Sequence, residues 1–234
     1  MALNIDTFKT RALTSLIFVA VMMTGLLWNK WSFLVLFTVI HFGCWFEFLA
    51  MLKRIYGEKH IPYTLFGLVY ITMPICMMID LRTSWSMVEG LATPDDFGTT
   101  IPVAIIFSLW VNDTMAYLVG SFIGKTPFSK ISPNKTWEGT IGGMILCIVI
   151  IGFVFPLIAE HFFYPFAQKQ TYFLIAALCA IFGTAGDLLE SKLKRMANVK
   201  DSGLLMPGHG GFLDRFDSLL VATPFVWLFL KLFA

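Results

Sequence analysis

Long apolar stretches separated by short polar segments dominate the 234-residue chain. A helix needs about 20 predominantly apolar residues to cross the hydrocarbon core of a membrane. Windows of that length predict about seven membrane spans, at residues 12–28, 31–52, 62–79, 101–123, 139–158, 171–187 and 216–233. The predicted fold class is therefore an all-α, polytopic transmembrane helix bundle.

Composition supports a membrane location and excludes several other classes. Hydrophobic residues make up 57% of the chain and charged residues only 14%, whereas a soluble domain carries about 25% charged residues. The chain therefore lacks the polar surface of a water-soluble globule, and we expect its apolar excess to face lipid. The 17 Lys and Arg nearly balance the 15 Asp and Glu, which gives no basic field for binding nucleic acid.

The polar segments divide the chain and set its expected orientation. Residues 1–100 carry N-terminal spans without a motif, and residues 101–234 form the expected catalytic region with loops at 124–138 and 188–215. Because cationic loops resist translocation, we place the N-terminus and both loops in the cytoplasm, which leaves only Lys30, Arg82, Lys169 and Lys231 outside. Glu47, near the inner end of the second span, either snorkels to the interface or faces the bundle.

Two polar residues lie where a membrane should not tolerate them. Asn112 and Asp113 fall near the middle of the fourth predicted span. A carboxylate at that depth costs at least a few kcal/mol unless it faces a partner or a wet cavity, which makes it a functional candidate. The alternative is a structural hydrogen bond between helices. Gly120 and Gly124 in the same span allow a close helix neighbour.

The loop at 124–138 combines three lysines with hydroxyl and amide side chains just before a helix begins. The site candidates in it are Ser132, Asn134, Lys135 and Thr136. Unpaired N–H groups at a helix start, together with lysines, suit an anion or phosphate. The alternative is a cationic loop that only fixes topology.

Two acidic pairs at three-residue spacing follow. Asp187 and Glu190 lie on one face of a helix that leaves the membrane, where two carboxylates can share one cation. Alternatively, Glu190 pairs with Lys194 at i+4. Asp214 and Asp217 repeat the spacing at the start of the last span, where they could also be helix-start acids.

Glycines surround a histidine in the loop before this last pair. Gly210 and Gly211 follow His209, and glycine lets main-chain N–H groups approach an anion. Carboxylates, lysines and glycines at one membrane face suit Mg²⁺-assisted phosphoryl or nucleotidyl transfer. Composition and spacing identify neither the nucleotide nor the lipid.

The stretch 191–217 resembles the C-terminal signature of the phosphatidate cytidylyltransferase family, also called CDP-diglyceride synthases. The matching positions are Ser191, Leu193, Lys194, Arg195, Lys200, Asp201, His209, Gly210, Gly211, Phe212, Asp214, Arg215, Phe216 and Asp217. Segments around 112–117, 132–139 and 186–191 are also similar to that family, so the resemblance covers roughly residues 109–217.

This resemblance implies the reaction of CTP with phosphatidate to give CDP-diacylglycerol and pyrophosphate, with Mg²⁺ as cofactor. It implies a catalytic set of Asp187, Asp214, Lys194, Arg195, Lys200 and Arg215. The expected metal ligands are Asp187 and Asp214, followed by Asp217 and Glu190. The expected substrate-binding residues are Asn112, Asp113, Ser132, Asn134, Lys135, Thr136, Ser191, Asp201, His209, Gly210 and Gly211.

We expect CTP, phosphatidate and the bilayer as partners and allow for a homodimer. The expected location is the bacterial cytoplasmic membrane, with the active site facing the cytoplasm. Two alternatives stay open: a CTP-dependent polyprenol or dolichol-type lipid kinase, and an ion-coupled transporter that uses Asp113 and Asp187. A transporter more often shows broken helices in two related halves, which this sequence does not.

Overall fold

The computed structural model describes residues 5–83, 97–162, 169–203 and 210–233, and these are helical throughout apart from short connections and one isolated bridge between Pro127 and Thr136. The elements are α1 (Ile5–Leu27), α2 (Lys30–Tyr56), the 3₁₀ segment η1 (Gly57–Thr64), α3 (Leu65–Gly67), the π-helical segment η2 (Leu68–Thr72), α4 (Met73–Thr83), α5 (Phe97–Ile123), α6 (Trp137–Phe162), α7 (Lys169–Met196) and α8 (Leu213–Phe233). The predicted all-α bundle is confirmed.

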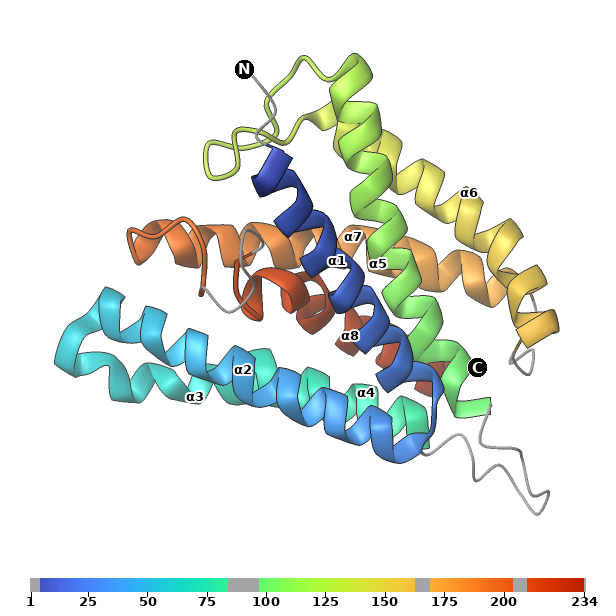
Figure 1. Ribbon diagram of the computed structural model, residues 1–234, viewed down its shortest axis with the longest axis horizontal. Coiled ribbons are helices and arrows are strands. Elements are labelled where there is room, and N and C mark those ends of the chain that lie inside the picture. Colours follow the sequence, from blue (N-terminus) through green and yellow to red (C-terminus); the bar gives the residue numbers. More distant parts are fainter. Residues whose placement is uncertain (1–4, 84–96, 163–168, 204–209, 234) are drawn as a thin grey trace.

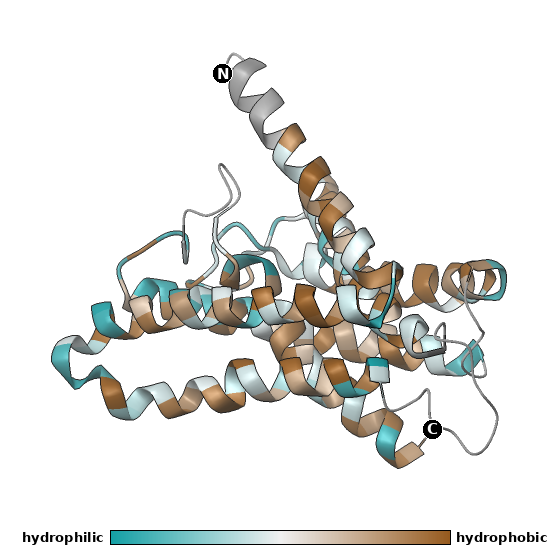
Figure 2. Ribbon diagram, turned by 60° about the horizontal axis from the view of Figure 1, so that its bottom comes forward, coloured by the Kyte–Doolittle hydropathy of each residue, from teal (hydrophilic) through white to brown (hydrophobic). Residues whose placement is uncertain are grey.

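Five helical runs are long and apolar enough to cross a membrane, and a shorter apolar helix covers Ala12–Leu27. The first of the five runs, Lys30–Thr83, is 54 residues long. Figure 1 shows that it folds back on itself at η1, so that α2 and the α3–α4 arm lie side by side. These arms, α1 and the four remaining helices correspond to the spans predicted from hydropathy. Apolar residues line the helices in Figure 2, and the chain is a multi-pass membrane protein.

Local signals explain where the first spans begin and end. The side chain of Asn29 accepts hydrogen bonds from the N–H groups of Trp31 (2.8 Å) and Ser32 (2.9 Å), and Ser32 Oγ accepts the N–H of Asn29 (3.1 Å). This capping box separates α1 from α2 where the apolar stretch is interrupted. Gly57, at φ +58°, follows the last residue of α2 in a conformation that favours glycine.

Two helices extend past the span ends predicted from hydropathy, in agreement with the helix that was expected to leave the membrane at Asp187 and with the helix start expected at Asp214. Helix α7 continues to Met196, past the predicted end of the span at 187, and α8 begins at Leu213 instead of 216. Hydropathy ends a span at its first charges, but Glu190 is fully buried and pairs with Lys194 one turn later, so the helix continues. The first part of the predicted 188–215 loop is therefore helical, and Asp187, Glu190, Ser191 and Lys194 follow one another on one face of α7.

Small residues bring the helices of the C-terminal half close together. A Cβ atom on Gly143 of α6 would lie 2.6 Å from the Cα atom of Ala116 on α5, and one on Gly139 would lie 2.8 Å from the Ala116 carbonyl oxygen. A Cβ on Gly186 of α7 would lie 2.5 Å from the carbonyl oxygen of Asp217 on α8. The close neighbour expected beside Gly120 is confirmed, since the Cα atom of Gly139 would lie 3.5 Å from a Cβ there.

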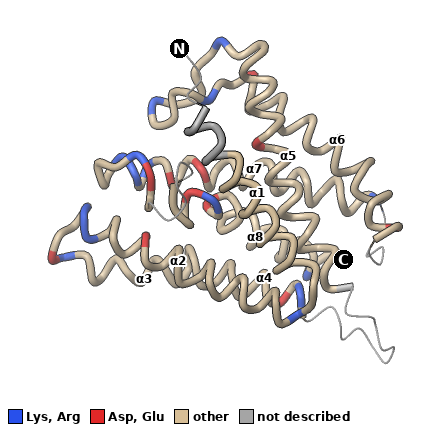
Figure 3. The backbone as a smooth tube through the Cα atoms, in the orientation of Figure 1, with Lys and Arg blue, Asp and Glu red and all other residues tan. Residues whose placement is uncertain are grey.

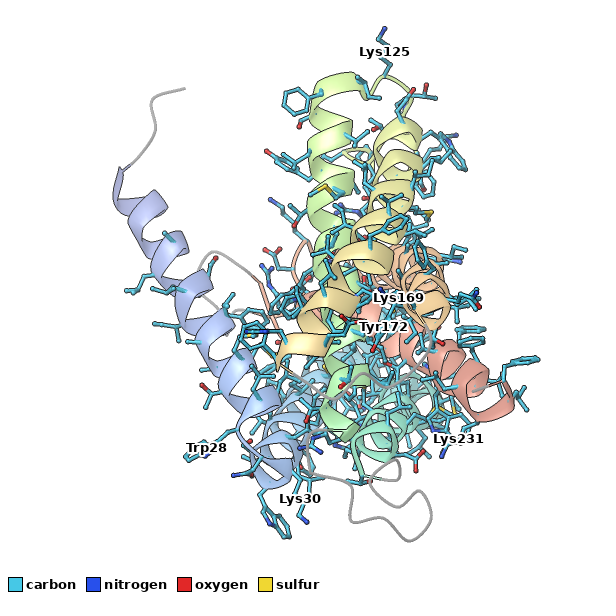
Figure 4. The ribbon with its side chains drawn as sticks, turned by 90° about the vertical axis from the view of Figure 1, so that its right-hand side faces the viewer. Trp28, Lys30, Lys125, Lys169, Tyr172 and Lys231 are labelled. Atoms are coloured by element: carbon cyan, nitrogen blue, oxygen red, sulfur yellow. The ribbon has the colours of Figure 1, made fainter. Side chains whose placement is uncertain are left out.

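Cations gather in distinct parts of the molecule. Figure 3 shows them where α2 turns into η1, at the end of α7 and in the α5–α6 loop. In Figure 4, Lys125 projects from the tip of the α5–α6 loop, while Lys30 and Lys231 project from the opposite end of the molecule.

Candidate active site

A cavity of about 520 Å³ lies between α5, α6, α7 and the loop that joins α5 to α6. Its lining residues are Asn112, Asp113, Ala116, Tyr117, Gly120, Ser121, Ser132, Asn134, Lys135, Thr136, Thr140, Thr184 and Asp187. Seven of the predicted site residues, distant from one another in the sequence, therefore share one cavity: Asn112, Asp113, Ser132, Asn134, Lys135, Thr136 and Asp187. Asp113 faces this cavity, as expected for a carboxylate inside a span.

The α5–α6 loop is fixed by hydrogen bonds between its ends. The carboxylate of Glu138 accepts the Thr126 hydroxyl (2.8 Å), the Thr126 N–H (3.1 Å) and the Lys125 N–H (3.2 Å). The N–H of Phe128 donates to the Lys135 carbonyl (2.8 Å). This closed loop holds Lys135 at the cavity, which a loop that only set topology would not need to do.

Lys135 forms an ion pair with Asp187 of α7 across the cavity wall. Asp187 also accepts a hydrogen bond from the Ser191 hydroxyl (3.3 Å). Burial lowers the pKa of the Lys135 ammonium group from its ordinary value, while the carboxylates of Asp113 and Asp217 act in the opposite direction. Both partners of the pair stay partly exposed, with 31% and 26% of their side chains accessible. An anion entering the cavity can therefore reach Lys135.

A second ion-pair network surrounds Asp214 at the start of α8. Lys194 pairs with Asp214 Oδ1 at 2.6 Å and with Glu190. Asp214 Oδ2 accepts the Ser202 N–H, the Ser202 hydroxyl and the Gly211 N–H, each at 2.8 Å. The alternative interpretation of Glu190, as the i+4 partner of Lys194, is confirmed.

A smaller cavity of about 100 Å³ joins this network to α5. Asp113, Asp214, Arg215 and Asp217 line it, together with apolar residues of α1, α5 and α8. Asp113 borders both cavities. Asp217 is buried, and its Oδ1 accepts the Ser218 N–H at 2.6 Å. Of the carboxylates predicted from spacing, Asp187 lines the larger cavity and Asp214 and Asp217 line the smaller one, whereas Glu190 lines neither.

The donor set suits Mg²⁺. In proteins this ion takes oxygen ligands, usually one or two carboxylates, with phosphates and waters completing the shell. Carboxylates line both cavities, and no three His, Cys, Asp or Glu side chains of the described residues form a group that would hold a metal unaided. The carboxylates present fit an ion that takes one or two ligands from the protein.

Some predicted residues lie elsewhere. Arg195, Lys200 and Asp201 are exposed and are not among the lining residues of either cavity. His209 lies outside the described residues. Gly210 has φ +82° and lies against the Asp214 carboxylate.

The glycine loop was expected to direct main-chain N–H groups at a ligand anion. In the structure, Gly211 N–H donates to Asp214, and the Phe212 and Leu213 N–H groups donate to Glu47 at 2.9 Å each. The anions that these three groups approach are carboxylates of the protein itself.

Sequence reasoning gave Glu47 no functional role. It lies on α2, is only 5% exposed, faces the bundle and also accepts the Ser202 hydroxyl at 2.6 Å. A carboxylate within an apolar helix is a functional candidate by default, and that was the available signal. The half of the chain described as free of motifs therefore contributes to the site.

Sequence comparisons relate the chain to a group of known proteins. Residues 65–233 match a family model described as the cytidylyltransferase family. The chain is 35% identical to a phosphatidate cytidylyltransferase of Bacillus subtilis over 80% of this chain and 64% of that protein. It is 33% identical to one from Rickettsia felis over 92% and 88% of the two chains, and 41% identical to one from Thermotoga maritima over 58% and 51%.

Proposed function

The chain belongs to the cytidylyltransferase family, and we propose that it transfers the cytidylyl group of CTP to phosphatidate, giving CDP-diacylglycerol and pyrophosphate. The observation that carries this proposal is the cavity where Ser132, Asn134 and Lys135 of one loop meet the carboxylates of α5 and α7. Cations and hydroxyls beside carboxylates, in a cavity large enough for a ligand, suit a polyphosphate bound with a metal ion.

The reaction needs alignment and charge compensation more than a covalent nucleophile. A phosphate oxygen of phosphatidate attacks the α-phosphorus of CTP, the bond from that phosphorus to the β-phosphate oxygen breaks, and pyrophosphate leaves. Both substrates are polyanions, so the protein must hold them together against their repulsion. The ion pair with Asp187 keeps the Lys135 ammonium group at the cavity before the substrate binds. Lys135 can therefore bind a phosphate oxygen after only a small movement of its side chain.

Asp187 in the larger cavity and Asp214 in the smaller one would offer carboxylates to Mg²⁺, with Asp113 lining both cavities and Asp217 lining the smaller. When bound, the ion would offset negative charge on the two substrates. Ser132, Asn134 and Thr136 would donate hydrogen bonds to the nucleotide. The partial exposure of Lys135 and Asp187 supports their role in exchanging partners with the substrate.

The membrane supplies one substrate and sets the orientation. The cavity reaches Asn112 and Asp113 within the α5 span, so a lipid headgroup can approach from the bilayer side. We propose that the site lies at the cytoplasmic face of a bacterial inner membrane, where it can take CTP from the cytoplasm. The cations of the α5–α6 loop and of the end of α7 support this orientation. A homodimer stays a prediction, which the mass of the purified protein in detergent would test.

The decisive experiment follows the phosphorus that is attacked. With purified protein, phosphatidate and Mg²⁺, CTP labelled at the α-phosphate should transfer its label to the chloroform-soluble product. CTP labelled at the γ-phosphate should give only water-soluble pyrophosphate. A lipid kinase would give the reverse pattern and would contradict the proposal. An Asp187→Asn variant, with one of the proposed metal ligands removed, is the control for background labelling.

A further inference from the structure

Glu47 connects the N-terminal helices to the site. Its carboxylate accepts hydrogen bonds from the Ser202 hydroxyl at 2.6 Å and from the Phe212 and Leu213 N–H groups at 2.9 Å each. Leu213 is the first residue of α8, so Glu47 satisfies N–H groups at the start of that helix. Glu47 is more than 150 residues earlier in the sequence, yet its carboxylate accepts the N–H groups that a local N-cap residue would otherwise accept.

The surrounding chain is shaped to enclose this carboxylate. Gly203 and Gly211 contact it so closely that a Cβ atom on either would collide with its oxygens. One turn earlier on α2, Gly43 leaves the space that the Phe212 ring fills. The segments 200–203 and 210–213 therefore close around one face of α2, and a larger residue at these glycines would separate them from it.

Ser202 links Glu47 to Asp214. Its hydroxyl oxygen lies 2.6 Å from a Glu47 oxygen and 2.8 Å from Asp214 Oδ2, and it also accepts the Asp214 N–H at 3.2 Å. A hydroxyl has one proton to donate, so the two carboxylates share it. Ser202 also donates its own N–H to Asp214 at 2.8 Å. A shift of Glu47 would therefore move Ser202 and, through it, Asp214.

We propose that Glu47 is a positioning residue for the transfer reaction, which holds Ser202 and the first turn of α8 so that Asp214 stays aligned with Lys194. The inference rests on the proposed function, because alignment of Asp214 matters only if that carboxylate takes part in the reaction. Buried carboxylates require hydrogen-bond donors. The donors here are the N–H groups of Phe212 and Leu213, which directly precede Asp214, and the hydroxyl of Ser202, which also bonds to Asp214.

The test compares Glu47→Gln and Glu47→Ala with Glu58→Gln, a matched control at an exposed position of η1. For folded, monodisperse protein, we expect both Glu47 variants to lower kcat by about tenfold or more while KM for CTP and phosphatidate changes by less than about threefold, as for the loss of an interaction that matters in the transition state. Glu58→Gln should keep wild-type kinetics.

Hydrogen exchange provides a readout that does not depend on activity. In substrate-free protein, the Phe212 and Leu213 amides should exchange faster in Glu47→Ala than in wild type, because their acceptor is removed. Ser202→Ala, assayed as folded and monodisperse protein, should also lower kcat. In the double variant Glu47→Ala with Ser202→Ala, the losses should be less than multiplicative, because both act through Asp214.

The outcomes separate the two proposals. If wild-type protein is active and the folded Glu47 and Ser202→Ala variants keep wild-type kcat, the positioning role is wrong and the proposed function stands. The positioning role would also be wrong if the lost activity of a Glu47 variant were explained entirely by a smaller amount of folded protein. Wild-type protein with no cytidylyltransferase activity would overturn the proposed function, and with it this role for Glu47.

Discussion

The two lysine–carboxylate pairs of the site differ in burial, and this predicts different roles. Lys135 and Asp187 are partly exposed at the cavity, whereas Lys194 has 15% of its side chain exposed and faces the fully buried Glu190. Exposed pairs contribute only about 0–1 kcal/mol to stability. Breaking a buried pair leaves an uncompensated charge and costs about 3–5 kcal/mol. We therefore expect Lys135 to matter mainly for activity and Lys194 for both activity and stability.

Replacing Lys135 tests the first half of this expectation. Lys135→Ala should reduce kcat/KM for CTP by about a hundredfold or more, since a charge that compensates a polyphosphate is lost. The melting temperature in detergent should stay close to that of wild type. Lys130→Ala, an exposed lysine of the same loop, is the control and should keep normal activity. Near-normal turnover by Lys135→Ala would exclude Lys135 from the site.

Replacing Lys194 tests the second half. Lys194→Ala should lower the free energy of unfolding by about 3–5 kcal/mol, because Glu190 would stay buried without its cation. Denaturant titration in detergent measures this change. Lys192→Ala, two residues earlier at an exposed position of α7, should leave the midpoint unchanged. Equal midpoints for the two variants would contradict the buried-pair argument.

The lowered pKa of Lys135 predicts the sign of a pH effect. Because burial favours the neutral amine, Lys135 loses its proton at a lower pH than an ordinary lysine. If transfer needs the charged form, kcat/KM falls as the pH rises through this pKa. Lys135→Arg stays charged throughout, so its alkaline decline should move to higher pH. Superimposable alkaline limbs for the two proteins would show that Lys135 does not control this decline.

At the scale of elements, hydropathy predicted where most helices lie. It did not predict how far each helix extends or where its geometry departs from the α-helix. Local apolar content determines whether a segment can span, and the predicted segment at 101–123 lies within α5. Helix α7 continues to Met196, past the charges at which a hydropathy window ends the span, and the i+4 spacing of Glu190 and Lys194 was the signal for this continuation. The π-helical turn Leu68–Thr72 likewise has no signal in apolar periodicity.

Close packing of α5 and α6 provides a test at this scale. Gly143→Ala should destabilise the protein by about 1–3 kcal/mol, because the new methyl group would meet the Ala116 backbone and force the helices apart. Gly142→Ala would meet mainly the movable side chain of Val119, so its loss should be smaller. Denaturant midpoints of both variants measure the difference. A larger loss for Gly142→Ala would contradict the packing argument.

At the scale of the whole molecule, the distribution of cations predicts orientation. In a variant without its four cysteines, a cysteine at Ser129 in the α5–α6 loop should react with a membrane-impermeant thiol reagent only after cell lysis. A cysteine at Lys30 should react in intact cells. The reverse labelling pattern would invert the proposed topology.

The assembly of the site shows what the sequence alone could not supply. Spacing placed Asp187 and Glu190 on one face of α7 and offered the pairing of Glu190 with Lys194, because these relations are local. Lys135 and Asp187 are 52 residues apart in the sequence. Both residues were assigned to one site from the sequence, but a contact between them was not predicted. Glu47 and Leu213 are 166 residues apart, and no local pattern joins them.

Helix α8 is held at both ends by one hairpin. Glu47 of α2 satisfies its first N–H groups, and near its other end Asp80 of α4 accepts the Trp227 indole N–H at 2.7 Å and pairs with Lys231 at 3.0 Å. The family match begins at residue 65, beyond Glu47. If Glu47 positions Asp214 as proposed, the smallest active unit includes α2 and is larger than the region that the family model matches. A transplant of that region onto another membrane scaffold would need to bring α2 with it.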